Sequence, residues 1–253
     1  MMIAMTGRAV LVTGASRGIG RAIAMAFAGS GDRVAIHCRA AVQLAEQLRE
    51  TLPGQGHVVV QADLADPDAV RTMVDRAAAA LDGLDVLVNN AGIYTPHPIL
   101  ESTYEEWQHR WRETLDTNLT GVANAIWCAV RHMQDSGGRI INVSSRGAFR
   151  GEPTHSAYGA SKAALNSLTQ SLAVALAPYA IAVTAVAPGF VQTDMTMELL
   201  EAAAGEQIRA QSPFNRVARP QEIAAAVHWL ASAEAEWASG TIIDLNGASY
   251  LRT

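Results

Sequence analysis

The feature that most constrains this chain is a series of short apolar runs that alternate with stretches of helical periodicity. Within each run the residues are continuously apolar and do not alternate with polar ones. Such runs are typical of strands buried on both faces, in a parallel sheet that helices cover on either side. The pattern predicts an α/β fold, a doubly wound parallel sheet of seven strands with helices on both faces. The expected strands are residues 8–13, 33–37, 57–61, 85–88, 139–143, 181–185 and 241–245.

Apolar residues recur at helical spacing between these strands and predict helices, among them residues 103–133, 156–177 and 198–210. No linker rich in glycine, serine or proline interrupts the 253 residues, so we expect a single domain over residues 1–253. The expected parts of this domain are a nucleotide half at about 6–143, a substrate and catalytic half at about 144–253, and a lid at about 194–215.

Composition excludes several classes of function. A formal net charge of −5 argues against a nucleic-acid partner, and no run of about 18 apolar residues is present to span a membrane. The two cysteines, Cys38 and Cys128, form neither a disulfide framework nor a metal cluster, so we expect no metal site. Residues 1–8 lack the layout of a signal peptide, and we expect a cytoplasmic protein.

A glycine-rich loop follows the first expected strand and opens the first helix. Its spacing, Gly14-x-x-x-Gly18-x-Gly20, permits a tight turn and brings backbone N–H groups close to a phosphate. The helix N-terminus adds unpaired donors and partial positive charge. The loop therefore predicts dinucleotide binding, with a purely structural turn as the alternative.

The end of the second strand predicts which dinucleotide is bound. An acid at this position would accept hydrogen bonds from a free ribose 2′-hydroxyl, but the residues here are His37-Cys38-Arg39. Arg17 in the phosphate loop supplies a second guanidinium, and two such groups suit a 2′-phosphate. We expect NADP(H) to be preferred over NAD(H), unless Arg39 is only a solvated loop charge.

Two further strand ends carry candidate ligand contacts. Asp63 and Leu64 follow the third strand, and Asn90, Ala91 and Gly92 follow the fourth. Loops at the carboxyl ends of parallel strands line the ligand crevice of such sheets. Asp63 is expected to accept from an adenine amino group, and the small residues to let a cofactor pass close to the backbone.

Tyr158 and Lys162 are four residues apart, which places them on one face of a helix. Ser144 and Ser145 lie upstream, at the end of an apolar run. This group suggests a catalytic acid with a supporting cation and hydroxyl. Taken alone, the spacing also fits an ordinary helix N-terminus with a solvated lysine.

Together these motifs resemble those of the short-chain dehydrogenase/reductase family over nearly the whole chain. The resemblance implies a Rossmann-like sheet and hydride transfer between nicotinamide and a carbonyl or secondary alcohol. The matching positions are residues 13–20, Asp63, Leu64, 89–92, Asn118, Ser145, Tyr158, Lys162, Pro188, Gly189, Thr193 and 244–247.

The resemblance implies a role for each catalytic residue. Tyr158 would be the general acid in reduction, and Lys162 would lower the phenol pKa from its reference value of about 10. Lys162 would also bond the nicotinamide ribose. Ser145, rather than Ser144, would donate to the substrate carbonyl oxygen, and Asn118 would hold a water that relays protons to Lys162.

The resemblance likewise implies the cofactor contacts, with Val191 and Thr193 at the nicotinamide carboxamide. The full expected set is Gly14, Ser16, Arg17, Gly18, Ile19, Gly20, Arg39, Asp63, Leu64, Asn90, Ala91, Gly92, Tyr158, Lys162, Pro188, Gly189, Val191 and Thr193.

Within the family the pattern is closest to 3-oxoacyl-[acyl-carrier-protein] reductases, which implies a small carbonyl or alcohol substrate, including an acyl thioester. Ser136 and Tyr179 stand where those reductases carry basic residues for the carrier protein, so a free small ketone, sugar or polyol is an open alternative. Arg146 and Arg150 either attract an anionic substrate or lie on a solvated rim.

A different class, a nucleotide sensor without turnover, usually lacks the tyrosine or the lysine, and both are present here. The family resemblance also implies a homotetramer, with helices 103–133 and 156–177 pairing across a two-fold axis.

Overall fold

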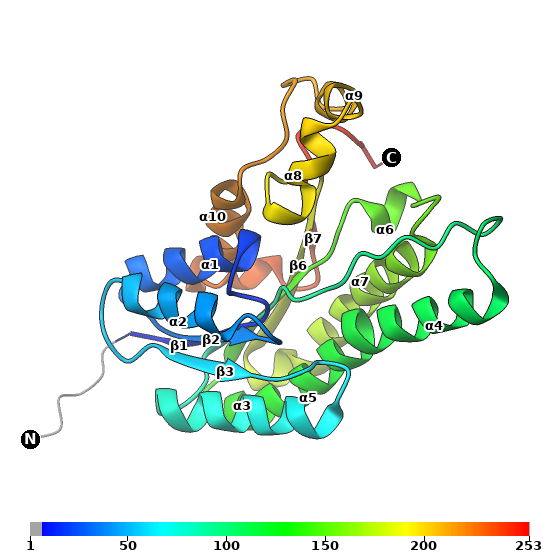
Figure 1. The fold of residues 1–253 in the computed structure, drawn as a ribbon. Coiled ribbons are helices and arrows are strands. Elements are labelled where there is room, and N and C mark those ends of the chain that lie inside the picture. Colours follow the sequence, from blue (N-terminus) through cyan, green and yellow to red (C-terminus); the bar gives the residue numbers. More distant parts are fainter. Residues whose placement is uncertain (1–6, 253) are drawn as a thin grey trace, which may run out of the picture.

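One parallel sheet organises the computed structural model, which describes residues 7–252. Residues 1–6 and 253 lie outside the described residues. They include the predicted start of the nucleotide half, at about residue 6, and most of the segment 1–8 that was examined for a signal peptide. The strand order is β3-β2-β1-β4-β5-β6-β7, and the predicted fold class is confirmed (Figure 1). The strands are β1 Ala9–Val12, β2 Arg33–Cys38, β3 Val58–Gln61, β4 Val86–Asn89, β5 Gly138–Val143, β6 Ile181–Pro188 and β7 Ile242–Leu245.

The sheet reverses its winding direction between β1 and β4, which pair in parallel with Val10 opposite Val86. On the other side of β1, Ala9 lies opposite Arg33 of β2. The loops that leave β1 and β4 therefore turn toward opposite faces and leave a crevice beyond the strand ends. Ligands of doubly wound sheets bind at this point.

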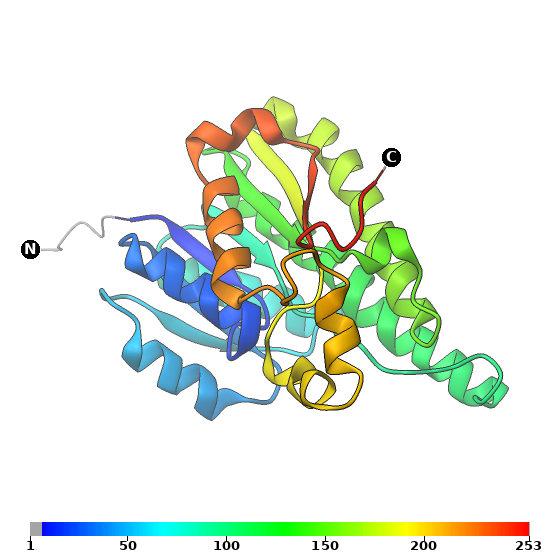
Figure 2. The same ribbon diagram turned by 90° about the horizontal axis from the view of Figure 1, so that it is seen from above.

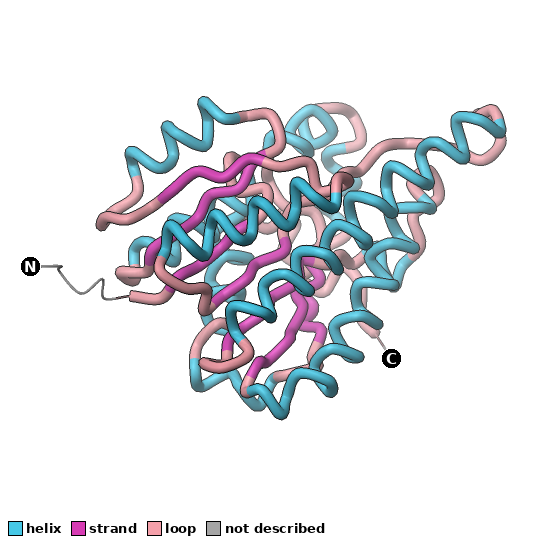
Figure 3. Tube along the Cα trace, turned by 90° about the horizontal axis from the view of Figure 1, so that it is seen from below, coloured by secondary structure: helices cyan, strands magenta, loops and turns pink. Residues whose placement is uncertain are grey.

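Helices cover both faces of the sheet (Figures 2 and 3). Val10 and Val12 of β1 pack with α1, α2 and α10, whereas Ala9 and Leu11 pack with α3, α5 and α7. The two apolar clusters explain why the strands are apolar at every position. The helices are α1 Gly18–Gly29, α2 Val42–Thr51, α3 Pro67–Leu81, α4 Tyr104–Leu115, η1 Asp116–Thr120, α5 Gly121–Met133, α6 Gly147–Arg150, α7 Ser156–Leu176, η2 Ala177–Tyr179, α8 Asp194–Glu201, α9 Gly205–Ala210, α10 Pro220–Leu230 and η3 Ala233–Ala238.

Two predicted helices differ from the structure. The helix expected at 103–133 contains one π-helical turn, η1, closed by a hydrogen bond from the Gly121 N–H to the Asp116 carbonyl. The helix expected at 198–210 is two helices, α8 and α9. The chain folds back between them so closely that a Cβ on Gly205 would collide with the Leu200 carbonyl. Of the helices in residues 7–252, none is long and apolar enough to cross a membrane.

Candidate active site

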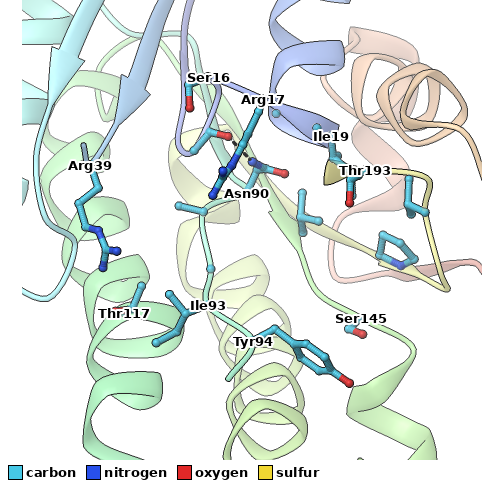
Figure 4. A pocket seen from close by; sticks show the side chains of 18 of the residues that line it. Ser16, Arg17, Ile19, Arg39, Asn90, Ile93, Tyr94, Thr117, Ser145 and Thr193 are labelled. Atoms are coloured by element: carbon cyan, nitrogen blue, oxygen red, sulfur yellow. Dashed lines mark hydrogen bonds between the residues drawn. The ribbon is translucent and has the colours of Figure 1, made fainter. Parts of the chain in front are cut away.

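A cavity of about 640 Å³ lies beyond the carboxyl ends of the strands. It runs from Arg39, at the end of β2, to Tyr94 and Ser145 at the opposite end (Figure 4). Every predicted cofactor and catalytic residue lines this cavity except Asn118. Lining residues that the sequence reasoning left out of the predicted set are His37, Cys38, Ala40, Ala41, Ala62, Ile93, Tyr94, Thr117, Val143, Ser144, Arg146, Glu152, Phe190, Asp194 and Thr196.

The glycine-rich loop has the geometry of an anion cradle. Gly14 and Gly18 have φ of 63° and 56°, a left-handed conformation that favours glycine. Helix α1 begins at Gly18, and the residue before it, Arg17, makes no side-chain cap. The first N–H groups of α1 are thus left without a side-chain acceptor, beside the cavity that Ser16 and Arg17 line. These donors fit a pyrophosphate.

His37, near the end of β2, supports the glycine-rich loop through a hydrogen bond to its backbone. The Gly14 N–H donates to His37 Nδ1 at 3.0 Å, and His37 Nε2 lies 3.1 Å from the Ala62 carbonyl oxygen. This arrangement requires a neutral ring with its proton on Nε2. Burial lowers the pKa of His37, which favours the same form. The only sequence signal for this role was the position of His37 at a strand end.

Asn90 ties the ends of β1 and β4 together. Its Nδ2 donates to the carbonyl oxygens of Thr13 at 2.8 Å and Gly14 at 3.1 Å. In return the Thr13 hydroxyl accepts from the N–H groups of Asn90 at 2.9 Å and Ala91 at 3.1 Å. A Cβ on Gly14 would lie 2.9 Å from the Ala91 Cα, so the two loops touch along their backbones. Asn90 therefore holds the loops after β1 and β4 together at the cavity wall.

Arg17 and Arg39 form the cationic end of the cavity, and both side chains are exposed. Asp63, at the end of β3, also lines the cavity. One of its oxygens already accepts from the Ala65 N–H at 3.0 Å, as part of a turn. No acid lies in residues 37–41 at the end of β2.

Tyr158, Ser145 and Lys162 meet at the other end. Tyr158 and Lys162 lie one turn apart on α7, and the Ser145 hydroxyl lies beside the phenol of Tyr158. Ser145 Oγ also accepts from the Gly147 N–H at 3.0 Å. The Ser144 hydroxyl instead donates to the backbone carbonyl of Lys162 at 3.3 Å. Of the two serines, Ser145 is the one that faces the tyrosine.

The electrostatics of Tyr158 differ from expectation. Burial raises the pKa of Tyr158, the hydrogen bond from Ser145 opposes this, and the charge of Glu152 raises it further. Lys162 was expected to lower this pKa. Its ammonium is instead bound to the Val143 carbonyl oxygen at 2.8 Å and lies 5.7 Å from the centre of the Tyr158 ring. Burial also lowers the pKa of Lys162 itself to about 8.

Asn118 lies behind the cavity wall, in the π-helical turn η1. Its Oδ1 accepts from the Ile93 N–H at 2.8 Å, and its Nδ2 donates to the Ile93 carbonyl at 2.9 Å. Nδ2 also lies 3.4 Å from the hydroxyl of Ser161. These bonds fix the backbone just after Gly92, whose Cβ position would lie 3.6 Å from Lys162 Nζ. The predicted proton relay through Asn118 stays a prediction.

Aromatic rings build the wall beside Tyr158. Tyr94 stacks on His155 with 3.6 Å between ring centres, and meets Tyr158 edge to face at 4.8 Å. The Tyr94 hydroxyl donates to Glu152 at 3.1 Å. Burial lowers the pKa of His155 to about 4, so its ring is neutral near pH 7. Among the side chains that the structure describes, no group of three or more from His, Cys, Asp and Glu is placed to hold a metal ion.

Comparison with known proteins agrees over nearly the full chain. A family model described as Enoyl-(Acyl carrier protein) reductase matches residues 14–247. The 3-oxoacyl-[acyl-carrier-protein] reductase FabG of Staphylococcus aureus is 39% identical over 247 residues, which cover 96% of this chain and 98% of the relative. The cis-4-hydroxycyclohexanecarboxylate dehydrogenase of Sinomonas cyclohexanicum is 40% identical over 243 residues, 95% of each chain.

A solved structure supports the same relationship. The crystal structure of a short chain dehydrogenase from Burkholderia cenocepacia J2315 in complex with NADP superposes with a TM-score of 0.87. The two sequences are 35% identical, and the match covers 98% of this chain and 99% of the other.

Proposed function

The chain belongs to the short-chain dehydrogenase/reductase family, an oxidoreductase family acting on carbonyl and CH–OH groups, and on that premise we propose its substrate and cofactor. We propose that it reduces the ketone of a 3-oxoacyl compound to the secondary alcohol, with NADPH as hydride donor. The observation that carries this proposal is one continuous cavity, with two arginines at one end and the Tyr158–Ser145 pair at the other.

The donor set supports a dinucleotide cofactor. The uncapped N-terminus of α1 would hold the pyrophosphate, and the loop after β4 would let the ribose pass close to Gly92. Lys162 would bond the nicotinamide ribose, and the backbone from Pro188 to Val191, with Thr193, would hold the carboxamide. NADPH, when bound, supplies the hydride.

The charges at the adenosine end support NADPH over NADH. Arg17 and Arg39 both line this end, and a guanidinium binds phosphate oxygens through paired N–H groups. A free ribose 2′-hydroxyl would call for an acid at the end of β2, where Cys38 and Arg39 stand instead.

At the reacting carbonyl, Ser145 would donate to the oxygen as negative charge develops there. Tyr158, whose pKa burial raises, keeps its proton at neutral pH and would transfer it to that oxygen. Lys162, held on the Val143 carbonyl, provides positive charge near the tyrosine ring. Because both Tyr158 and Lys162 are present, turnover is favoured over a sensor role.

The 3-oxoacyl substrate class rests on similarity to FabG, whose name specifies it. The equally similar dehydrogenase from Sinomonas is named for a secondary alcohol on a carboxylate-bearing ring. Both names describe a ketone or a secondary alcohol on a compound that also carries an acyl group or a carboxylate. Homotetramer formation, a single domain and a cytoplasmic location are part of the proposal, supported by family resemblance.

The decisive experiment follows NADPH oxidation with S-acetoacetyl-N-acetylcysteamine, a small uncharged 3-oxoacyl thioester. We expect turnover that depends on the enzyme and a lower KM for NADPH than for NADH. Absence of turnover both with this thioester and with the free acid acetoacetate would refute the substrate class, and an equal or lower KM for NADH would refute the cofactor preference. Sedimentation at micromolar concentration should give a species larger than the 26.8 kDa monomer.

A further inference from the structure

A second, smaller cavity of about 160 Å³ adjoins the candidate active site. The two cavities share two residues, Arg146 and Phe190. The smaller one lies between the end of β7, the segment after α9 and the start of α10. It is large enough for a group of a few atoms, and nothing in the reduction chemistry described so far uses it.

Arg146 forms the boundary between the two cavities. It follows Ser145 directly, and its backbone N–H donates to the Pro188 carbonyl at 2.8 Å. The residue as a whole is only 5% exposed. Nη1 donates to the Ser249 hydroxyl at 2.6 Å, and the guanidinium lies 5.3 Å from the centre of the Phe190 ring.

No described carboxylate lies within ion-pair distance of this buried cation, although the charge of Glu152 acts on it from farther away and raises its pKa. Among the side chains that the structure describes, no carboxylate forms an ion pair with Arg146. Glu222, the acid that lines the smaller cavity, is engaged by Arg216 at 2.8 and 2.7 Å. Glu152, the nearest acid along the chain, accepts from the Tyr94 hydroxyl instead.

The unused donors of Arg146 face open space. Its Nε and Nη2 hydrogen-bond to no other described residue, yet neither atom is sealed from solvent. The open space that Arg146 lines is that of the two cavities. Because these donors are open to solvent, a ligand that enters either cavity can replace water on them.

We propose that Arg146 binds an anionic group of the substrate, in the simplest case a carboxylate, while the ketone lies at Ser145 and Tyr158. This rests on the proposed reductase function, which it refines. The ketone would occupy the larger cavity and the carboxylate would reach the Arg146 side, at the opening of the smaller one. Arg146 is then a specificity-determining residue that selects 3-oxo acids with a free carboxylate over uncharged esters and thioesters.

The test compares three ketones with NADPH: acetoacetate, its methyl ester, and S-acetoacetyl-N-acetylcysteamine. The first two share the reacting ketone and differ in charge at the carboxyl group. For the wild type we expect kcat/KM for acetoacetate to exceed that for the methyl ester by about 30-fold, the equivalent of about 2 kcal/mol for a charge-assisted hydrogen bond.

Variants of Arg146 test whether this residue causes the preference for acetoacetate over its methyl ester. Arg146→Met should remove most of that preference by raising KM for acetoacetate, while KM for the methyl ester should change little. Arg146→Lys should restore part of it. Arg150→Met is the matched control, because Arg150 is exposed, bonds Gln211 at 2.7 Å and does not line the cavity.

The outcomes separate the two proposals. If none of the three ketones is reduced, the reductase function itself fails. If the thioester is reduced but the wild type shows no preference for acetoacetate, the inference on Arg146 is overturned and the reductase function stands. A preference that survives Arg146→Met also overturns it. If Arg146→Met folds poorly, the wild-type enzyme still tests the proposal. Its kcat/KM should be higher for acetoacetate than for the methyl ester, and butyrate should inhibit competitively whereas butanol should not.

Discussion

The ammonium of Lys162 donates to the backbone carbonyl of Val143 across 2.8 Å. This bond joins helix α7 to the end of β5, the strand that leads into Ser145. The same carbonyl partly compensates a cation that is only 4% exposed. The ammonium of Lys162 is therefore fixed in position by the fold, and the loss of its proton has consequences for both stability and rate.

The first prediction concerns pH. Burial lowers the pKa of Lys162 from its ordinary 10.5 to about 8. Between those values the unfolded chain keeps a proton that the folded chain has lost, so this residue makes the free energy of unfolding rise with pH. Urea unfolding of the wild type and Lys162→Met should show the wild type gaining stability relative to the variant from pH 8 to 10. A constant difference would contradict the assignment.

In the same window the folded protein loses positive charge beside the tyrosine. We expect kcat/KM for ketone reduction to fall as pH rises above about 8, with NADPH binding weakening in parallel. Stopped-flow rates and fluorescence titrations with NADPH across this range measure the two effects separately. A rate that is level up to pH 10 would show that the Lys162 charge is not required.

The second prediction concerns Tyr158. Tyr158→Phe removes the transferable proton but keeps the ring, so carbonyl reduction should fall by about 100-fold to 10,000-fold, the usual range for a general acid. NADPH affinity should change little. Steady-state rates and a binding titration test this, with Tyr104→Phe as control, because Tyr104 is 69% exposed on α4. Activity of a tenth of the wild type or more would rule out the role.

The third prediction concerns Gly14. Its φ of 63° and the 2.9 Å approach of a Cβ to the Ala91 backbone both disfavour a side chain. Gly14→Ala should lower the free energy of unfolding by at least about 1 to 2 kcal/mol and weaken NADPH binding. Gly29→Ala is the matched control: a Cβ there meets nothing within 4 Å. If both variants unfold at the same urea concentration, the close approach of the loops is not as described.

The fourth prediction concerns Arg39. Arg39→Ala should raise the Kd for NADPH by about tenfold, equivalent to about 1.4 kcal/mol, while leaving that for NADH nearly unchanged. Arg21→Ala, an exposed arginine on α1 that does not line the cavity, controls for overall charge. An equal loss of affinity for NADPH and NADH would mean that Arg39 does not bind the 2′-phosphate.

Much of the fold was predictable because a strand buried on both faces is apolar at every position. The expected runs at 33–37 and 139–143 fall within one residue of β2 and β5. The last part of β6 was missed: it continues to Pro188, three residues beyond the expected end. Pairing with β7 extends it, with Pro188 opposite Leu245, and such a partner is invisible in the local sequence.

Sequence by itself determined the family, the phosphate loop, and the order in which Ser145, Tyr158 and Lys162 occur, because each depends on residue type and short spacing. Only the tertiary structure decided how these groups behave. The pKa of Tyr158 is raised because distant segments bury it, and His37 proved to support Gly14. Arg146 meets Ser249 across 103 positions of the chain. Burial and long-range contacts arise from packing between remote segments, so no local pattern records them.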